Sequence, residues 1–313
     1  YTYQLNTKKL ASLDSKSNGL PHHTIYSIIR TTDNQIYVGT YNGLCRYIEE
    51  SGKFENIPLP VNRNVSNLFV NSLLEDTSRQ CIWIGMEGSL FQYTPATGLM
   101  KPIDAFHNNS IKSLALDGDG NLLAGTDNGL YVYQNDNGTL QHIVHDSGNI
   151  QSLTNNIIWN IFSDQEHNIW LGTDYGISLS RYNSALQFVP ISQITGTGDG
   201  NQFYSLFRDS KGFYWFGGTN GVIRFTHPAG NKHDAIWYRM GDKNHPLSHN
   251  RIRHIYEDRE QQLWIATDGS INRYDYNTHQ FVHYNIVDST GTNNTNWAYY
   301  PVSYTHITLP TIA

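Results

Sequence analysis

Charged residues, cysteines and long apolar segments are all scarce in this 313-residue chain. Asp, Glu, Lys and Arg make up 15% of it, against roughly 25% in an average soluble domain. The formal net charge is −6, so we expect no nucleic-acid partner for this segment. No stretch approaches the roughly 20 apolar residues of a membrane span. Long helical-period tracts are also missing, which excludes a coiled coil or an α-solenoid.

The two cysteines, Cys45 and Cys81, are too few for a disulfide scaffold or a cysteine-based zinc site. Free thiols are the default reading, but a bridge between them stays open in an oxidising compartment. The chain begins with Tyr1 and shows no signal-peptide pattern there, so we expect an internal piece of something longer.

A five-residue string of the type Ile-Trp-Leu-Gly-Thr recurs six times along the chain. The fourth residues of successive copies lie 40 to 49 residues apart, a period typical of propeller blades. The six copies are Ile36–Thr40, Ile82–Met86, Leu122–Thr126, Ile169–Thr173, Tyr214–Gly218 and Leu263–Thr267, the last with Ala266 where the others have Gly.

Each repeat unit predicts four short strands. An apolar first strand leads to a turn whose Asp should accept hydrogen bonds from turn amides, and the Trp-Gly string forms the second strand. The aromatic residue should fill the space between blades, and the Gly two places later should admit a neighbouring backbone. A turn Gly with positive φ then leads to the third strand. The turn residues are Asp76, Asp117, Asp164, Asp209 and Asp258 (Thr31 in the first unit), and the turn glycines are Gly43, Gly88, Gly129, Gly176, Gly221 and Gly269.

The sequence therefore predicts an all-β fold, a β-propeller of four-stranded blades with about six full blades and an incomplete seventh. Residues 1–13 match the end of a third strand and a fourth strand, and should contribute a closing strand to a neighbouring blade. Asn296–Tyr300 should begin the seventh unit. Residues 301–313 resemble a translated sequencing adaptor, with Ile307 the one departure, so we expect an artefact there and a propeller over residues 1–300.

Two long repeats, Ser152–Gly176 and Leu247–Gly269, resemble the two-component regulator propeller repeat. The resemblance implies the periplasmic sensor region of a membrane-anchored bacterial hybrid two-component protein. In that family, propellers precede an immunoglobulin-like module, one membrane span, a histidine kinase and usually a response regulator. It therefore implies a non-enzymatic sensor whose partners are a small ligand, further propeller and kinase domains and, as one option, a second copy of the full-length protein.

One column varies where the rest of the repeat does not: the second residue of the innermost strand. These residues should lie at similar depth around the central channel, near the loops that leave the second strand. Aromatic rings with convergent polar groups suit a sugar, and Lys112 and Arg253 suit an acidic group on it. We therefore expect glycan fragments as ligands, although the same residues would also serve simply to fill the channel entrance. The candidate ligand-binding residues are Tyr26, Lys112, Trp159, Tyr204, Arg253, Tyr41, Tyr175 and Asp174, and the column and its surroundings add Asn71, Glu87, Asp127 and Asp268.

Catalytic and metal-binding motifs are poor, so we expect no catalytic residue, metal or cofactor in this segment. His22 and His23 adjoin Pro21 in a loop and favour a solvated pair. Residues 117–121 mimic the start of a calcium loop, but Gly at the sixth place and Glu at the twelfth are missing, which favours a β-turn. The Gly-rich residues 195–200 favour a flexible loop. A propeller enzyme, such as a lyase or glycan-cleaving protein, and a protein-interaction scaffold both remain open as alternatives.

Overall fold

A computed structural model describes residues 2–4, 9–11, 16, 18–60, 68–106, 109–134, 137–192, 201–226, 234–244 and 246–284. These residues form six four-stranded antiparallel sheets and one two-stranded sheet, with a three-residue 3-10 helix, η1 (Asp104–Phe106). The expected all-β propeller is confirmed, with six blades among the described residues. In that part of the chain, no helix is long and apolar enough to cross a membrane.

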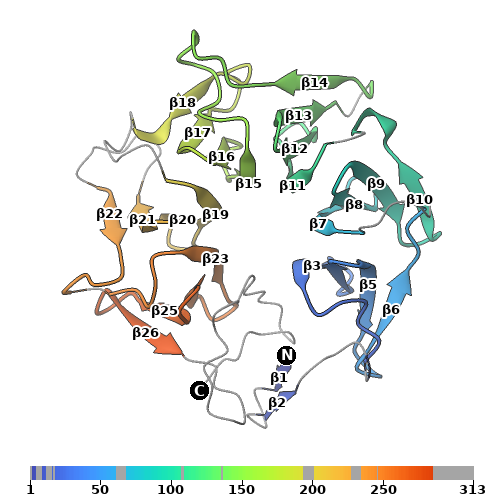
Figure 1. Cartoon of the computed structure of the whole chain (residues 1–313), viewed down its shortest axis with the longest axis horizontal. Coiled ribbons are helices and arrows are strands. Elements are labelled where there is room, and N and C mark those ends of the chain that lie inside the picture. Colours follow the sequence, from blue (N-terminus) through green and yellow to red (C-terminus); the bar gives the residue numbers. More distant parts are fainter. Residues whose placement is uncertain are drawn as a thin grey trace. The chain divides into compact units, whose positions relative to one another are not determined.

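Each blade is a meander whose strands pair in chain order (Figure 1). Blade 1 comprises β3 (Ile25–Arg30), β4 (Ile36–Thr40), β5 (Gly43–Ile48) and β6 (Lys53–Ile57). Blade 2 comprises β7 (Val70–Asp76), β8 (Cys81–Met86), β9 (Ser89–Thr94) and β10 (Leu99–Pro102). Blade 3 comprises β11 (Ile111–Leu116), β12 (Leu122–Thr126), β13 (Gly129–Tyr133) and β14 (Leu140–Ile143).

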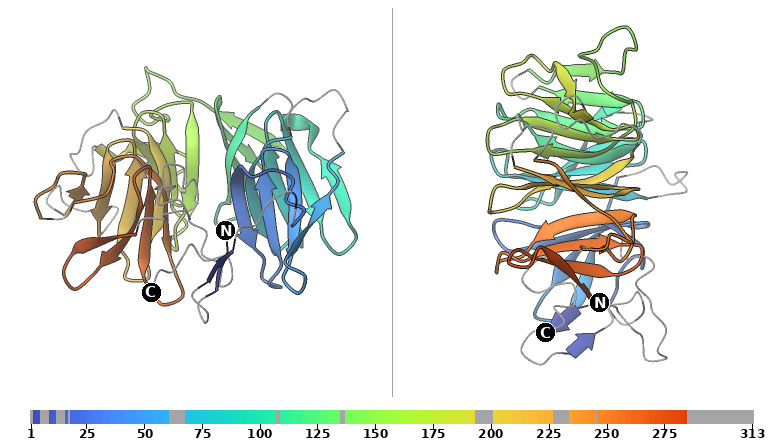
Figure 2. Two further views of the ribbon diagram at one scale, coloured as in Figure 1. Left: turned by 60° about the horizontal axis from the view of Figure 1, so that its bottom comes forward. Right: turned by 90° about the vertical axis from the view of Figure 1, so that its left-hand side faces the viewer.

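Blades 4 to 6 repeat this plan, and Figure 2 shows the antiparallel strands of the blades from two further directions. Blade 4 comprises β15 (Ile158–Ser163), β16 (Ile169–Thr173), β17 (Ile177–Ser180) and β18 (Phe188–Pro190). Blade 5 comprises β19 (Phe203–Arg208), β20 (Tyr214–Gly218), β21 (Gly221–Phe225) and β22 (Ile236–Tyr238). Blade 6 comprises β23 (Ile252–Glu257), β24 (Leu263–Thr267), β25 (Ile271–Asp275) and β26 (Gln280–Tyr284).

The chain divides into two compact units. The N-terminal unit comprises Ala11–Val144, Asn156–Ile161 and Tyr1, and the C-terminal unit comprises Thr2–Leu10, His145–Asn155 and Phe162–Ala313. Within the N-terminal unit, β3 packs beside β7 and β7 beside β11. Within the C-terminal unit, β19 packs beside β23, and β16 beside β19. Each unit therefore buries its apolar strands between successive blades.

The predicted turn carboxylate does more than bind amides. In blade 4, Oδ1 of Asp164 accepts the backbone amides of Glu166 (3.0 Å) and Asn168 (2.8 Å), as expected. Its Oδ2 accepts the indole N–H of Trp170 at 2.8 Å, which ties the turn to the second strand. The same carboxylate-to-indole bond occurs in three other blades, as the pairs Asp76–Trp83, Asp209–Trp215 and Asp258–Trp264.

Tyrosine hydroxyls extend this arrangement from blade to blade in the C-terminal unit. Tyr214 of blade 5 donates to Asp164 of blade 4 at 3.0 Å, and Tyr276 of blade 6 donates to Asp209 of blade 5 at 2.6 Å. Burial, with the neighbouring carboxylate, raises the pKa of both tyrosines. Both hydroxyls therefore stay protonated and act as permanent donors.

The glycine of the second strand is needed for close packing: its neighbour is a backbone carbonyl at Gly172, as predicted, but a side chain at Gly85 and Gly217. A β-carbon at Gly85 would lie 2.6 Å from Cγ2 of Ile111, and one at Gly217 would lie 2.4 Å from Cγ2 of Ile252. In each case the contact is with the first apolar residue of the next blade. Any larger side chain would therefore push two blades apart.

Some local predictions were wrong or incomplete. Gly269 is not the turn glycine of blade 6: its φ is not positive, and Ser270 holds the position that Gly176 holds in blade 4. The Thr267 hydroxyl donates to the Ser270 carbonyl at 2.8 Å, as Thr173 does to Gly176 at 2.9 Å. A β-carbon on Gly269 would lie 2.8 Å from the Ser248 carbonyl oxygen, so this glycine serves close approach instead. The strand β10, which completes blade 2, had no sequence prediction.

The two ends of the chain are only partly described. The predicted N-terminal strands exist as β1 (Thr2–Gln4) and β2 (Lys9–Ala11), but they pair with each other in a separate two-stranded sheet. Among the described residues they do not extend a blade, contrary to expectation. Asn296–Tyr300 and residues 301–313 lie outside the described part of the chain, and the predictions made for them stay predictions.

We predict that Trp170→Ala lowers the free energy of unfolding by about 3–5 kcal/mol, more than any change of a candidate ligand-binding residue. Its ring is fully buried among Tyr214, Phe216 and Phe225, and its loss would also leave Asp164 without one donor. Chemical denaturation measures the change. Tyr182→Ala, at a 42% exposed ring, is the control and should cost no more than about 0.5 kcal/mol. An unchanged midpoint for Trp170→Ala would contradict the assigned packing.

Candidate functional site

The variable column of residues coincides with a β-bulge. In blade 1, Ile25 pairs with Thr40 and Ser27 with Gly39, so the strand register shifts by one residue at Tyr26. Similar register shifts occur at Asn71, Lys112, Tyr204 and Arg253. Bulges re-aim side chains and are frequent next to functional sites. We call the end of each blade that carries this residue the bulge end, and the opposite end, with the Asp turns, the turn end.

The bulge end of the N-terminal unit carries a row of aromatic rings. The rings of His22 and His23 stack at 4.2 Å between centroids, and His22 lies 4.8 Å from Tyr41. Tyr41 lies 4.1 Å from Phe69, whose edge faces Tyr26 at 6.1 Å. Burial, together with the charge of His23, lowers the pKa of His22. The structure thus brings together Tyr26 and Tyr41, as predicted, and adds two histidines that the sequence indicated only as a solvated pair.

Two more candidates meet in the same unit. The Lys112 ammonium lies 4.8 Å from the centre of the Trp159 ring, a cation–π contact between blades 3 and 4. Nearby in sequence, Ser110 donates its hydroxyl to Glu87 at 2.6 Å. Lys112 is therefore already matched to an aromatic face.

The bulge end of the C-terminal unit carries a chain of polar contacts across three blades. The Tyr204 hydroxyl donates to Oε1 of Gln202 at 2.5 Å, and Nε2 of Gln202 donates to Asp174 at 2.6 Å. On its other side, the Tyr204 ring lies 5.8 Å from the Arg251 guanidinium carbon. Tyr175, also a candidate, follows Asp174 and is 52% exposed.

The sequence analysis assigned Arg253 to an acidic group of the ligand. In the structure, its guanidinium is already paired with a carboxylate of the protein. Its Nε and Nη2 donate to the two oxygens of Asp268 at 2.5 and 3.2 Å. Arg251 lies at 4.0 Å from the same carboxylate and is the more exposed of the two arginines. Sequence reasoning missed Gln202 and Arg251, because both lie one residue outside the strand rather than in the variable column.

The residue after the bulge distinguishes blade 6. Blades 1, 2, 3 and 5 place Ser27, Ser72, Ser113 and Ser205 opposite the second-strand glycine, whereas blade 6 places His254 opposite Ala266. The Ser205 hydroxyl accepts the amide of Ile255 in the next blade at 2.8 Å, and Ser113 accepts that of Ile161 at 3.0 Å. Burial lowers the pKa of His254 to about 4.

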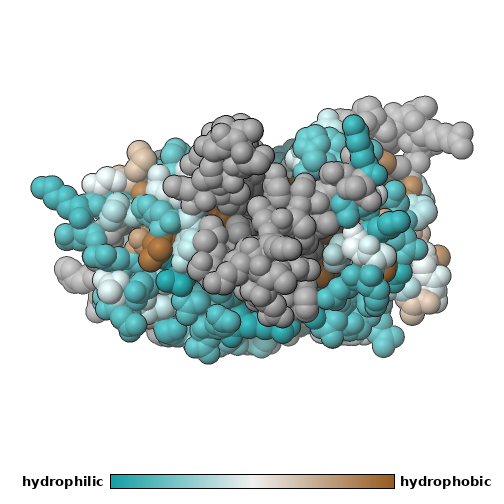
Figure 3. Space-filling view, turned by 90° about the horizontal axis from the view of Figure 1, so that it is seen from below, coloured by the Kyte–Doolittle hydropathy of each residue, from teal (hydrophilic) through white to brown (hydrophobic). Residues whose placement is uncertain are grey.

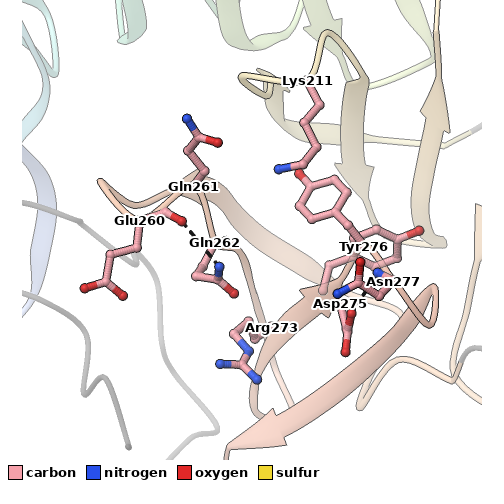
Figure 4. Close-up of a pocket in the computed structure, with 9 residues that line it drawn as sticks. Lys211, Glu260, Gln261, Gln262, Arg273, Asp275, Tyr276 and Asn277 are labelled. Atoms are coloured by element: carbon pink, nitrogen blue, oxygen red, sulfur yellow. Dashed lines mark hydrogen bonds between the residues drawn. The ribbon is translucent and has the colours of Figure 1, made fainter.

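A separate cavity of about 310 Å³ lies at the turn end of blades 5 and 6 (Figure 4). The Lys211 ammonium lies 3.9 Å from the centre of the Tyr276 ring, and Asp275 accepts the amides of Asn277 (2.8 Å) and Thr278 (3.3 Å). The carboxylate of Asp275 thus bonds within the turn, and the Lys211 ammonium lies on a ring of the cavity wall. We therefore do not include this cavity in the candidate site. Its lining is Lys211, Glu260, Gln261, Gln262, Arg273, Tyr274, Asp275, Tyr276 and Asn277.

Other potential sites are weaker. Among the described residues, no group of His, Cys, Asp and Glu could hold a metal ion. Asp117 accepts the amides of Asp119 (2.9 Å) and Asn121 (2.8 Å), the β-turn that was predicted. Cys45 and Cys81 are free and buried, and burial raises the pKa of Cys45 to about 12. The described surface in Figure 3 is mostly hydrophilic, with apolar residues in small separate groups.

The family comparison agrees with these repeats. The two-component regulator propeller model matches residues 19–42, 152–175, 197–220 and 246–269. The chain therefore carries two-component regulator propeller repeats, and the predicted resemblance is confirmed.

Particular relatives are equally informative. The chain is 82% identical to the extracellular domain of BT4673 from B. thetaiotaomicron, a proposed hybrid two-component system, over 94% of this chain and 40% of that domain, with a TM-score of 0.56. It is 25% identical to histidine kinase P4 of Formosa agariphila, over 90% of this chain and 21% of the kinase. It thus spans only about two fifths and one fifth of these relatives. Virginiamycin B lyase from Staphylococcus aureus, 13% identical over 84% of each chain with a TM-score of 0.60, shares the fold alone.

The half-buried His254 predicts acid sensitivity. Its pKa of about 4 in the folded protein lies below its usual 6.5, so only the unfolded chain binds the proton between these values. Its contribution to stability is therefore complete above pH 6.5 and is lost as the pH falls towards 4, by about 3 kcal/mol in total. Urea denaturation between pH 7.5 and 4 measures this loss.

The matched variant is His254→Ser, which places the serine of four other blades in blade 6. It should have a smaller loss of stability over the same pH interval. Equal pH dependence of the two proteins would show that other groups control acid unfolding.

Proposed function

We propose that this chain is part of the extracellular, periplasmic ligand-sensing region of a hybrid two-component signalling protein. The support is its 82% identity to part of such a domain, together with its two-component regulator propeller repeats. In the full-length protein, occupancy of the propeller would be passed to a histidine kinase through the membrane. The chain itself acts by binding, without catalysis, and neighbouring propeller domains or a second copy complete the assembly.

We further propose that the ligand is a glycan fragment, bound at the bulge end of the blades. The observation that carries this proposal is the bulge column: the repeat conserves its packing residues from blade to blade, yet places a large aromatic or cationic side chain on each bulge except Asn71. All are half-buried, while the residue before each is largely apolar. Rings stack on the apolar faces of sugars, and Gln202, Asp174 and Arg253 offer polar groups for hydroxyls.

Calorimetry with neutral and acidic oligosaccharides tests the glycan proposal. We expect a micromolar affinity for the best ligand, about −8 kcal/mol, since association must also offset lost motion. Tyr204→Ala, in the unit that also holds Gln202, Asp174 and Arg253, should weaken the best ligand at least tenfold, about 1.4 kcal/mol, through loss of stacking.

Tyr182→Ala removes an exposed ring outside the bulge column and should leave affinity unchanged. Binding that survives Tyr204→Ala would place the ligand elsewhere. Trp159→Ala then tests the bulge end of the N-terminal unit, and Lys211→Ala tests the cavity at the turn end. If no oligosaccharide binds at millimolar concentration, the glycan proposal is wrong.

A further inference from the structure

Two arginines share one carboxylate at the bulge end of blade 6. Asp268 forms a two-point hydrogen-bonded ion pair with Arg253, at 2.5 and 3.2 Å. Arg251 approaches the same carboxylate only through Nε, at 4.0 Å, which is too long for a hydrogen bond. The side chains of Arg253, Asp268 and Arg251 are 12%, 22% and 44% exposed. Asp268 therefore pairs with Arg253, which is the less exposed of the two arginines.

This arrangement leaves one positive charge in excess around Asp268. The other acid of this network, Asp174, lies beyond Tyr204 and accepts a hydrogen bond from Gln202. Arg251 lies over the Tyr204 ring, so its guanidinium is directed along an aromatic face and not towards a second carboxylate. A guanidinium of this kind has donors that match the oxygens of a carboxylate or sulfate group.

The backbone of Arg251 is held in place on both sides. Its amide donates to Nδ1 of His249 at 3.0 Å, and its carbonyl accepts the amide of Asp268 at 3.1 Å. The position of Arg251 relative to Asp268 is therefore fixed before any ligand arrives, which lowers the entropic cost of binding.

Building on the proposed function, we propose that Arg251 and Tyr204 form an oxyanion subsite that selects sugars carrying a carboxylate or sulfate group. The oxyanion binds the guanidinium of Arg251 beside the Tyr204 ring. Arg253 is a positioning residue: it holds Asp268 away from Arg251 and thereby keeps the subsite open. This reverses the sequence expectation, which assigned anion recognition to Arg253 itself.

The test uses sodium sulfate as the probe, with the full chain at constant ionic strength. The Nε–H resonance of Arg251 is followed by NMR in arginine-labelled protein. We expect a saturable shift in the millimolar range that is lost in Arg251→Gln. Arg46→Gln is the control, since Arg46 is a partly exposed arginine paired with Glu55 at 2.6 Å in another blade, and it should leave sulfate binding unchanged.

Variants of the Arg253–Asp268 ion pair test whether sulfate binding depends on that pair or only on the positive charge of Arg251. In Arg253→Gln, Asp268 is free to pair with Arg251, so sulfate affinity should fall at least tenfold although Arg251 is intact. In the double variant Arg253→Gln with Asp268→Asn, affinity should return to within about threefold of the parent. Thermal melts confirm that each variant is folded. A non-saturating shift, an Arg251→Gln variant that still binds sulfate, or an Arg253→Gln variant with parental affinity would each overturn the proposal.

Oligogalacturonate and its methyl ester then distinguish this inference from the proposed function. The free acid should bind more tightly than the ester in the parent, and equally weakly in Arg251→Gln. If neutral oligosaccharides bind while sulfate and Arg251→Gln have no effect, the glycan function stands and the oxyanion subsite is wrong. If sulfate binds at Arg251 but no oligosaccharide binds, the subsite stands for free oxyanions and the glycan function is wrong.

Discussion

A carboxylate at the turn end, buried in three blades and half-buried in blade 6, organises four of the six described blades. Its first oxygen closes the turn through backbone amides, and its second accepts the indole of the tryptophan that fills the space between sheets. For Asp76, burial alone would oppose ionisation, but hydrogen bonds from Ser78, Trp83 and Arg79 hold its pKa below the usual value. The charged form is thus stabilised by its own donors, and turn, strand and neighbouring blade become parts of one network.

Because the turn carboxylate holds the turn end of a blade, the side chains at its bulge end can differ from blade to blade. In blade 3, Leu123 stands where other blades have the aromatic residue, and Asp117 keeps the side-chain amide of Asn121 at 2.8 Å, as Asp164 of blade 4 keeps that of Asn168 at 3.0 Å. Because packing is secured by the turn carboxylate, the Gly contact and the buried second strand, the bulge residue is free to differ from blade to blade. A binding surface can then change without altering the fold.

The bulge ends of the two units, each taken by itself, differ in chemistry. The N-terminal unit presents mainly rings, from His22 to Phe69, with a lysine already placed on Trp159. The C-terminal unit presents a polar chain from Asp174 to Asp268, with a guanidinium over Tyr204. Aromatic faces suit neutral sugar surfaces, and the guanidinium suits an oxyanion, so each unit by itself favours a different chemical group on a ligand.

The architecture of a single blade could be predicted from the amino-acid sequence. The repeat of Trp, Gly and Asp follows from requirements that every blade shares, so the strands, the Asp turns and the Gly contacts were readable from spacing alone. The sequence also indicated the bulge column, since variation at one position in a conserved unit is visible without coordinates. The sequence prediction of the last turn was wrong by one residue. Ser270, and not Gly269, closes that turn, because Gly269 must make room for the Ser248 carbonyl.

The pairing of the charged side chains could not be predicted from the sequence, because it depends on contacts between separate strands. Arg251, Arg253 and Asp268 are close along the chain, but their spacing does not say which arginine takes the carboxylate. Likewise, His22 and Phe69 come from different blades, and only packing joins them to Tyr41. The pairing is decided by the distance from Asp268 to each arginine, which is 2.5 Å for Arg253 and 4.0 Å for Arg251. The local pattern fixes the strands, whereas the contacts among their ends depend on how successive blades pack.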